Sequence, residues 1–216
     1  MSLQQKLLKQ HSIITMKFYK YISVVYNSFK NATSYILFEH FQILFPLPHF
    51  SVMDQTKYDR QIRLFGEETQ QKLFNLKVQV LGTSNPVSME IIKNIVLLGV
   101  QHIVVEEEMI EEVKKFIPNS LEEINENLKI EYSTAVQDSN FLFVIDNKLE
   151  TKENVAFYFI CSKCFTIKFS NCCHECKESV TGMLLAKHCL VGAYAVQEFI
   201  KYIQGKSYTH NFVFKF

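Results

Sequence analysis

The strongest constraint on the fold is the alternation of short apolar runs with amphipathic segments after Met53. Short apolar runs bounded by turn residues are typical of buried strands, and apolar residues recurring every three or four positions are typical of helices. Strands that alternate with helices form mainly parallel sheets with right-handed crossovers. The sequence therefore predicts an α/β, Rossmann-like domain over residues 53–216, with a mainly parallel sheet and helices on both faces.

The individual elements follow from the same patterns. Strands are expected at 77–81, 102–105, 130–133, 141–145, 165–169 and 211–216. Helices are expected at 88–98, 120–128, 151–161 and 183–204. The second of these begins with Ser120 and Glu123 as a capping box, and Thr151 caps the third. Gly99 occupies the position where a glycine ends a helix, and the continuous apolar run 141–145 suits the centre of a sheet.

Size and charge exclude several classes of protein. The chain has 216 residues, is 48% hydrophobic and carries a net charge of +1, which suits one globular domain with an extension. A nucleic-acid binder would carry a basic excess, and no window is apolar enough for a membrane span, so neither partner is expected. Without a convincing secretory signal, the six cysteines are expected to be reduced, and the predicted location is the nucleus and cytoplasm.

Residues 1–52 differ in composition from the rest of the chain. They hold ten of the 29 aromatic residues and a single acidic residue, Glu39. The segment fits no targeting class well. We interpret it as an N-terminal extension that is poorly folded, or that precedes a true start at Met53. An amphipathic arm that binds a partner is the alternative.

The two arginines of the chain, Arg60 and Arg63, both lie in the stretch from Tyr58 to Gly66. All the other 21 cationic side chains among the 23 Lys and Arg residues are lysines. Arginine offers a planar fork of donors that binds phosphate or carboxylate in a bidentate manner, which lysine cannot do. The pattern indicates anion binding, although a surface salt bridge is the plain alternative.

The turn after the first strand is a poor phosphate cradle. It reads Gly82-Thr-Ser-Asn-Pro-Val-Ser88, so a single glycine remains and Pro86 removes a backbone donor. Glu106 lies where a ribose-binding carboxylate belongs in nucleotide-binding folds. Its acidic neighbours favour the simpler interpretation, a carboxylate at the start of a helix. The sequence therefore predicts that this chain does not hold a nucleotide phosphate by itself.

The order of these segments resembles the adenylation domains of ubiquitin-like-modifier activating enzymes and their ThiF/MoeB relatives. That family opens with a similar YDRQIRLWG word, followed by a short helix, a strand and a glycine-rich turn. The resemblance covers residues 58–105 and returns near 192–216, where Gly192, Ala193 and Ala195 permit close helix packing. The Asn211-Phe-x-Phe ending resembles the smaller subunit of the SUMO-activating enzyme. Compared with that family, the domain over residues 53–216 is shortened.

The resemblance implies a role for the chain. In the heterodimeric enzymes one half is catalytic and binds ATP with Mg²⁺ and the modifier, and the other lends an arginine across the interface. This chain, which has lost glycines from the turn but kept its arginines, resembles the second, non-catalytic half. The resemblance therefore implies that Arg60 is the arginine lent to the partner. Arg63 is expected to support the interface or pin the opening helix. The expected partner is the catalytic subunit, with the modifier an indirect one.

Two other functions remain open. A free-standing homodimeric sulfur-carrier adenylyltransferase would use each chain's arginine on the other chain's nucleotide, but the degraded turn argues against it. A degenerate scaffold would keep only a binding face.

The cysteines form two knuckle-like pairs, Cys161-x-x-Cys164 and Cys173-x-x-Cys176, which could hold a tetrahedral zinc ion. Bacterial-type relatives carry zinc on paired motifs that lie far apart in sequence. Here a predicted strand separates the pairs, and Cys161 falls on a predicted helix that points elsewhere. The sequence therefore favours ordinary thiols, with zinc as the weaker alternative, and no cysteine has the surroundings of a catalytic thiol.

Overall fold

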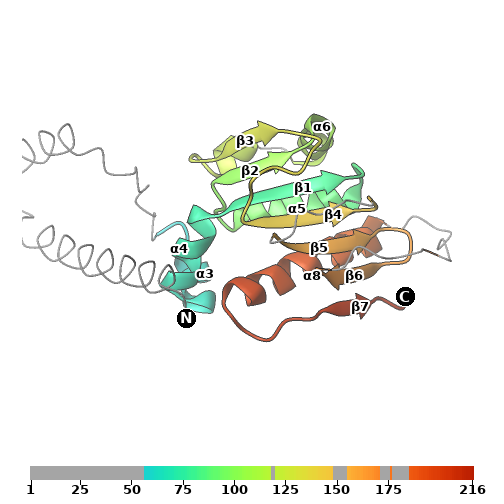
Figure 1. Ribbon diagram of the computed structural model, residues 1–216. Coiled ribbons are helices and arrows are strands. Elements are labelled where there is room, and N and C mark those ends of the chain that lie inside the picture. The colour runs from blue at the N-terminus through green and yellow to red at the C-terminus, as the bar shows by residue number, and fades with distance from the viewer. Residues whose placement is uncertain (1–55, 118–119, 148–154, 171–175, 177–184) are drawn as a thin grey trace, which may run out of the picture. The chain divides into compact units, whose positions relative to one another are not determined.

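The computed structural model describes residues 56–117, 120–147, 155–170, 176 and 185–216, so the predicted extension 1–52 and Thr151 lie outside the described residues. The described strands form one sheet in the order β3-β2-β1-β4-β5-β6-β7 (Figure 1). Their bounds are β1 Lys77–Gly82, β2 His102–Val105, β3 Lys129–Tyr132, β4 Phe141–Ile145, β5 Ala156–Cys161, β6 Thr166–Phe169 and β7 Asn211–Val213. This is the predicted α/β, Rossmann-like architecture, but the expected helices on both faces are not found within the described residues, because the hydrophobic cluster on the second face contains no helical residue.

The sheet is parallel from β3 to β5 and antiparallel at β6 and β7. The chain leaves β1 toward β2 and β3 on one side, and then returns to β4 on the other side of β1. The strand order therefore reverses between β1 and β4. In open α/β sheets, the carboxyl ends of strands at such a reversal form the ligand-binding crevice.

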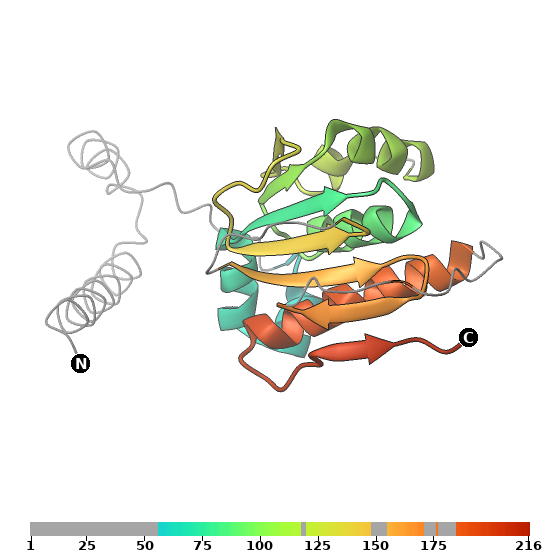
Figure 2. The ribbon, with the colours of Figure 1, turned by 45° about the vertical axis from the view of Figure 1, so that its right-hand side comes forward.

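The described helices are α3 Asp59–Phe65, α4 Glu67–Asn75, α5 Pro86–Leu97, α6 Glu107–Phe116, α7 Leu121–Ile124 and α8 Leu185–Ile203. Helices α5, α6 and α8 share one hydrophobic cluster with one face of the sheet, and Figures 1 and 2 show α5 and α8 behind the strands. Of the helices in the described ranges, none is long and apolar enough to cross a membrane.

Close contact between α5 and α8 depends on a small residue. A Cβ atom at Gly192 of α8 would lie 2.9 Å from the carbonyl oxygen of Val87 on α5. The close packing that the small residues of this segment predict is therefore present, and α5 is the element they pack against.

The opposite face of the sheet carries a second, smaller cluster. Its buried members are Leu81, Leu142, Val144, Phe157, Phe159 and Cys161. They alternate along the strands with residues of the first cluster, because successive side chains of a strand point to opposite faces. Every residue of β4 is buried, as its continuous apolar sequence predicts.

Most predicted elements are confirmed to within a few residues. Gly99 ends α5 with a φ of 88°, while the amides of Gly99 and Val100 return to the carbonyls of Val96 and Ile95. The predicted helix 120–128 is shorter in the structure, because Asn125 turns inward after Ile124. Its buried side chain donates to the carbonyl of Val100 at 2.9 Å.

The predicted helix from Thr151 through Cys161 is wrong, because residues 156–161 form strand β5. This strand pairs with β4 on one side and β6 on the other. Its sequence, Ala-Phe-Tyr-Phe-Ile-Cys, is rich in aromatic residues, which favour strands, and lacks the polar spacing of an amphipathic helix. The error matters for function because it moves Cys161 from a helix to the end of a central strand.

Candidate functional site

The carboxyl ends of β1 and β4 form the crevice position of this fold. Gly82 ends β1 with a φ of 111°, and a Cβ atom there would lie 2.0 Å from the carbonyl oxygen of Ile145. Only glycine fits this conformation and this approach of β1 to β4. The glycine of the turn is thus explained by contact between two strands, without any phosphate.

The first turn of α5 uses its own amide donors. The side-chain oxygen of Asn85 accepts hydrogen bonds from the amides of Val87 at 2.9 Å and Ser88 at 3.2 Å. The hydroxyl of Ser88 accepts from the amide of Asn85 at 2.9 Å and donates to its carbonyl at 2.7 Å. Pro86 has no amide hydrogen. The donors that bind phosphate at a helix N-terminus are therefore engaged by the protein itself.

A carboxylate closes the same corner from β4. Asp146 directly follows β4 with a φ of 55°, and it accepts from the side-chain amide of Asn85 at 3.1 Å. It also accepts from the amide and the hydroxyl of Ser162, at 2.7 and 2.5 Å. Neither Asp146 nor Ser162 is among the site residues expected from the sequence. The available signal was an aspartate placed immediately after the most apolar strand, at the crevice edge.

Glu106 ties β1 to β2. It has the extended backbone of a helix N-cap before α6, as the acidic run predicts, but its side chain does not cap the helix. The carboxylate instead accepts a hydrogen bond from the amide of Gly82 at 2.9 Å. The carboxylate that could bind a ribose is therefore used in holding the turn.

The segment 58–66 packs against the carboxyl end of α5. The ring of Tyr58 is buried and packs edge-on against Phe74, with 5.0 Å between the ring centroids. It also packs closely on Gly99, because a Cβ atom at Gly99 would lie 2.9 Å from a carbon of the Tyr58 ring. The side chains of Gln61 and Gln70 donate to the carbonyls of Leu97 and Leu98, at 2.9 and 2.7 Å. These glutamines satisfy carbonyls that the end of α5 leaves unpaired.

The two arginines of α3 have different surroundings. The guanidinium of Arg63 forms an ion pair of 2.8 Å and a hydrogen bond of 3.1 Å with the carboxylate of Asp59, one helical turn earlier. Both side chains are largely exposed, so this pair adds little to stability. Arg60 is exposed, and its side chain makes no hydrogen bond or ion pair within the part of the chain that the structure describes. Leu64, one turn further on the same side, is 74% exposed.

Arg60 and the β1 turn lie at opposite ends of the sheet. Helix α3 sits beside the carboxyl end of α5, whereas Asn85 caps the amino end of α5. With 12 residues, α5 is about 18 Å long. Figure 1 shows α3 at the ends of the strands away from their arrowheads. The structure therefore does not bring Arg60 together with Gly82 or Glu106.

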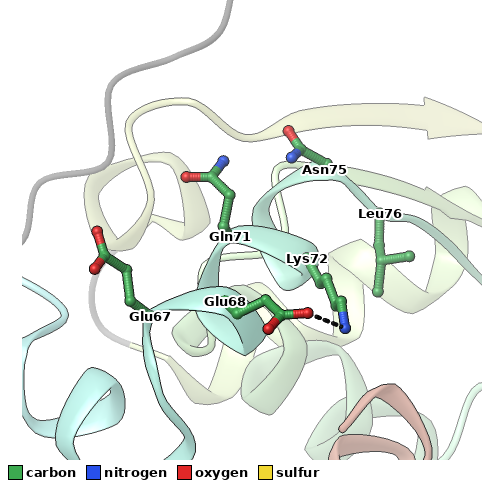
Figure 3. A pocket seen from close by; sticks show the side chains of 6 residues that line it. All are labelled: Glu67, Glu68, Gln71, Lys72, Asn75 and Leu76. Carbon is green, nitrogen blue, oxygen red and sulfur yellow. Dashed lines mark ion pairs between the residues drawn. The ribbon is translucent and has the colours of Figure 1, made fainter. Parts of the chain in front are cut away.

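An open pocket of about 600 Å³ lies along α4 (Figure 3). Its described lining comes from that helix and the residue after it: Glu67, Glu68, Gln71, Lys72, Asn75 and Leu76. Lys72, its one cationic side chain among these, pairs with Glu68 at 2.9 Å. An anionic ligand would have to compete with Glu68 for Lys72, so this pocket is a poor phosphate site.

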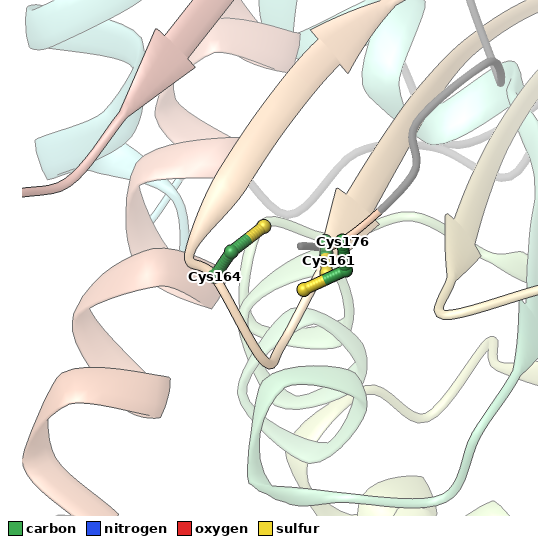
Figure 4. Close-up of side chains that lie close together, drawn as sticks. All are labelled: Cys161, Cys164 and Cys176. Atoms are coloured by element: carbon green, nitrogen blue, oxygen red, sulfur yellow. The ribbon is translucent and has the colours of Figure 1, made fainter. Parts of the chain in front are cut away.

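Three of the four cysteines that the sequence offers as the weaker, zinc-binding alternative lie together. The sulfur atoms of Cys161, Cys164 and Cys176 are all within 4.8 Å of one another (Figure 4). The fourth, Cys173, lies outside the described residues. The alternative that the sequence ranked lower therefore gains a geometric basis.

Comparison with known proteins gives one match by sequence and a group of matches by structure. The NEDD8-activating enzyme E1 regulatory subunit of Caenorhabditis elegans is 50% identical over 46 residues, which are 21% of this chain and 8% of that protein. No family model matches the chain.

The structural matches include MccB of Escherichia coli. MccB solved with MccA has a TM-score of 0.53 at 12% identity, over 73% of this chain and 66% of MccB. MccB solved with ATP has a TM-score of 0.53 at 13% identity, over 72% of this chain and 66% of MccB. The chain thus spans part of each protein it matches. At this level of identity the likeness concerns the fold, and the chain has the Rossmann-like α/β fold of MccB.

Proposed function

We propose that the chain is the non-catalytic, regulatory subunit of a heterodimeric ubiquitin-like-modifier activating enzyme. It binds the catalytic subunit, which holds ATP and Mg²⁺ and meets the modifier, and it lends Arg60 to that nucleotide. The partner performs the adenylation and the thioester chemistry. The proposed location is the nucleus and cytoplasm.

The position of Arg60 carries the proposal. Arg60 lies on α3, beside the carboxyl end of α5, and the turn at which this chain would hold a nucleotide lies at the amino end of α5, about 18 Å away. An arginine at that place cannot serve its own crevice but can serve a nucleotide bound by another chain. A guanidinium placed at developing phosphate charge from a neighbouring subunit is an established catalytic device.

The state of the crevice supports the same division of roles. The backbone donors and polar groups at the β1–β4 edge are already hydrogen-bonded within the chain, through the side chains of Asn85, Ser88, Asp146 and Glu106. A phosphate would have to displace several of these hydrogen bonds at once. The same observation weighs against a homodimeric adenylyltransferase, in which every chain needs a working crevice.

The more specific part of the proposal concerns which modifier the enzyme activates. The Asn211-Phe-x-Phe ending favours SUMO, whereas the relative with 50% identity over 46 residues belongs to NEDD8 activation. We keep SUMO as the proposed modifier and make NEDD8 the direct competitor in the test.

Reconstitution tests the proposal. The full chain is mixed with the catalytic subunit of either the SUMO- or the NEDD8-activating enzyme, and ATP–pyrophosphate exchange is measured with the matching modifier. We expect no exchange by the chain alone and exchange by the SUMO pair. Exchange by the NEDD8 pair alone would replace the modifier and keep the role. Exchange by the isolated chain would establish the homodimeric enzyme instead, and a chain that binds neither subunit would leave only a scaffold.

A further inference from the structure

We propose that Cys161, Cys164 and Cys176 bind a zinc ion, which links the turn between β5 and β6 to position 176. The site is structural and does not depend on the proposed role in modifier activation. Its three thiols are supplied between residues 161 and 176, around one hairpin, and not by pairs far apart in the chain.

The local geometry is that of a zinc knuckle. Cys161 is the last residue of β5 and Cys164 lies in the turn before β6, so the Cys-x-x-Cys pair forms the hairpin turn itself. The backbone amides of Cys164 and Lys163 donate hydrogen bonds to the sulfur of Cys161. Such amides stabilise a thiolate, which is the form that binds metal.

The distances suit a tetrahedral ion. Zinc–sulfur bonds of about 2.3 Å place the sulfurs of a tetrahedral site about 3.8 Å apart. The three sulfurs already lie within 4.8 Å of one another, so a shift of about 1 Å or less brings them to this separation. Three thiolates select soft or borderline metals and reject Mg²⁺ and Ca²⁺. Zinc is the member of that group most commonly held by structural cysteine sites.

The hairpin is held in place from outside the cluster. Ser162, the first residue between the two cysteines, donates its amide and hydroxyl to Asp146 at the end of β4. The sulfur of Cys164 lies 3.2 Å from the hydroxyl of Thr166, the first residue of β6. Hydrogen bonds of this kind around metal ligands fix their orientation. Cys173, in the same Cys-x-x-Cys motif as Cys176, lies outside the described residues and is not part of the proposed site.

Metal analysis of the full-length chain, purified without chelator, tests the site. We expect about one zinc ion per molecule. Cys164→Ser and Cys176→Ser should each lose it. Because Cys176 is exposed, its replacement leaves the core intact. The matched control is Cys189→Ser on α8, whose thiol is outside the cluster and whose zinc content should stay at the wild-type level.

Cobalt gives a second readout that is independent of activity. Co²⁺ added to the metal-free chain should produce thiolate-to-cobalt charge-transfer absorption and the strong visible bands of a tetrahedral site. Both should weaken in Cys164→Ser and Cys176→Ser and remain in Cys189→Ser. A zinc-free wild-type chain that has lost two hydrogens by mass would show a disulfide and overturn the proposal. Zinc retained by both cluster variants would overturn it as well.

Discussion

Asn85 donates its side-chain amide to the carboxylate of Asp146 at 3.1 Å, across the reversal of strand order between β1 and β4. The same Asn85 caps α5 with its side-chain oxygen, so both polar atoms of this side chain are engaged within the chain. In a nucleotide-binding Rossmann-like domain, phosphate occupies this position at the helix N-terminus. Here the protein has replaced that ligand with its own polar groups.

The first prediction concerns nucleotide affinity. The isolated chain should not bind ATP with micromolar affinity, because phosphate must compete with Asn85 for the amides of Val87 and Ser88. Isothermal titration calorimetry with ATP and Mg²⁺ checks this. Micromolar binding would show that the closed turn opens readily, and the non-catalytic role would then lose its structural support.

The second prediction concerns Arg60. Arg60→Lys should leave the heterodimer assembled and slow adenylate formation by the partner ~10–100-fold, because lysine keeps the charge but loses the planar fork. Arg63→Lys is the matched control, since Arg63 already grips Asp59. It should leave the rate of adenylate formation close to that of wild type. Unchanged ATP–pyrophosphate exchange by an intact Arg60→Lys pair would reduce the chain's contribution to a surface.

The third prediction concerns Gly82. Gly82→Ala should cost about 4 kcal/mol of unfolding free energy or prevent folding, because the new Cβ meets a backbone oxygen. Gly205→Ala is the control, with a φ of 66° and nothing within 4 Å of its Cβ position. It should cost only the strain of a left-handed residue, about 1–2 kcal/mol. Urea unfolding compares the two, and equal losses would mean that β1 and β4 separate easily.

The fourth prediction concerns pH and Glu198. Burial raises the pKa of this carboxyl group, but hydrogen bonds from Lys201 at 2.5 Å and from the amide of Thr209 at 2.6 Å outweigh burial and lower the pKa below its ordinary value. A lowered pKa stabilises the fold above the unfolded value of about 4.3, and this contribution is lost as the pH falls through the folded value.

Glu198→Gln should therefore destabilise the chain by about 1–3 kcal/mol at neutral pH, and the difference from wild type should shrink below about pH 4. Urea unfolding at several pH values measures it. The exposed Glu68, paired with Lys72, gives the control Glu68→Gln, which should match wild type at neutral pH. A deficit of Glu198→Gln that does not change with pH would point to packing and not to charge.

The fifth prediction concerns residues 1–52. A chain starting at Met53 should be expressed and should bind the catalytic subunit as tightly as the full chain, because the residues proposed to meet that subunit, Arg60 and Arg63, both follow Met53. Affinity measured by surface plasmon resonance decides the matter. Weaker binding by the shorter chain would favour the alternative, a partner-binding arm.

The sequence predicts the parallel half of the sheet well. β2 and β4 have their predicted bounds and β1 is one residue longer, because each is a short apolar run next to glycine or polar residues. β5 is missed although its apolar, aromatic run is as continuous as that of β4. The prediction instead extends a helix from the capping residue Thr151 through Cys161, because periodicity alone does not distinguish a short apolar run of a strand from one of a buried helix.

The sites are harder to predict because they depend on contacts across the sheet. Asp146 and Ser162 meet only once β4 and β5 are known to be neighbours, and the left-handed backbone of Asp146 leaves no mark in its sequence. The cysteine cluster depends on the same strand. With Cys161 placed on a helix, zinc is geometrically awkward, and with Cys161 at the end of β5 it is not.

Helix α3 buries none of its own residues. It is held by Tyr58 before it, by one hydrogen bond from Gln61 and by the glycine joint at Gly66 after it. Its outward side, which carries Arg60 and Leu64, can therefore vary without loss of folding. Substitutions at the exposed positions around Arg60 would therefore alter the proposed partner surface at little cost to folding, because that surface is separate from the core that holds the sheet.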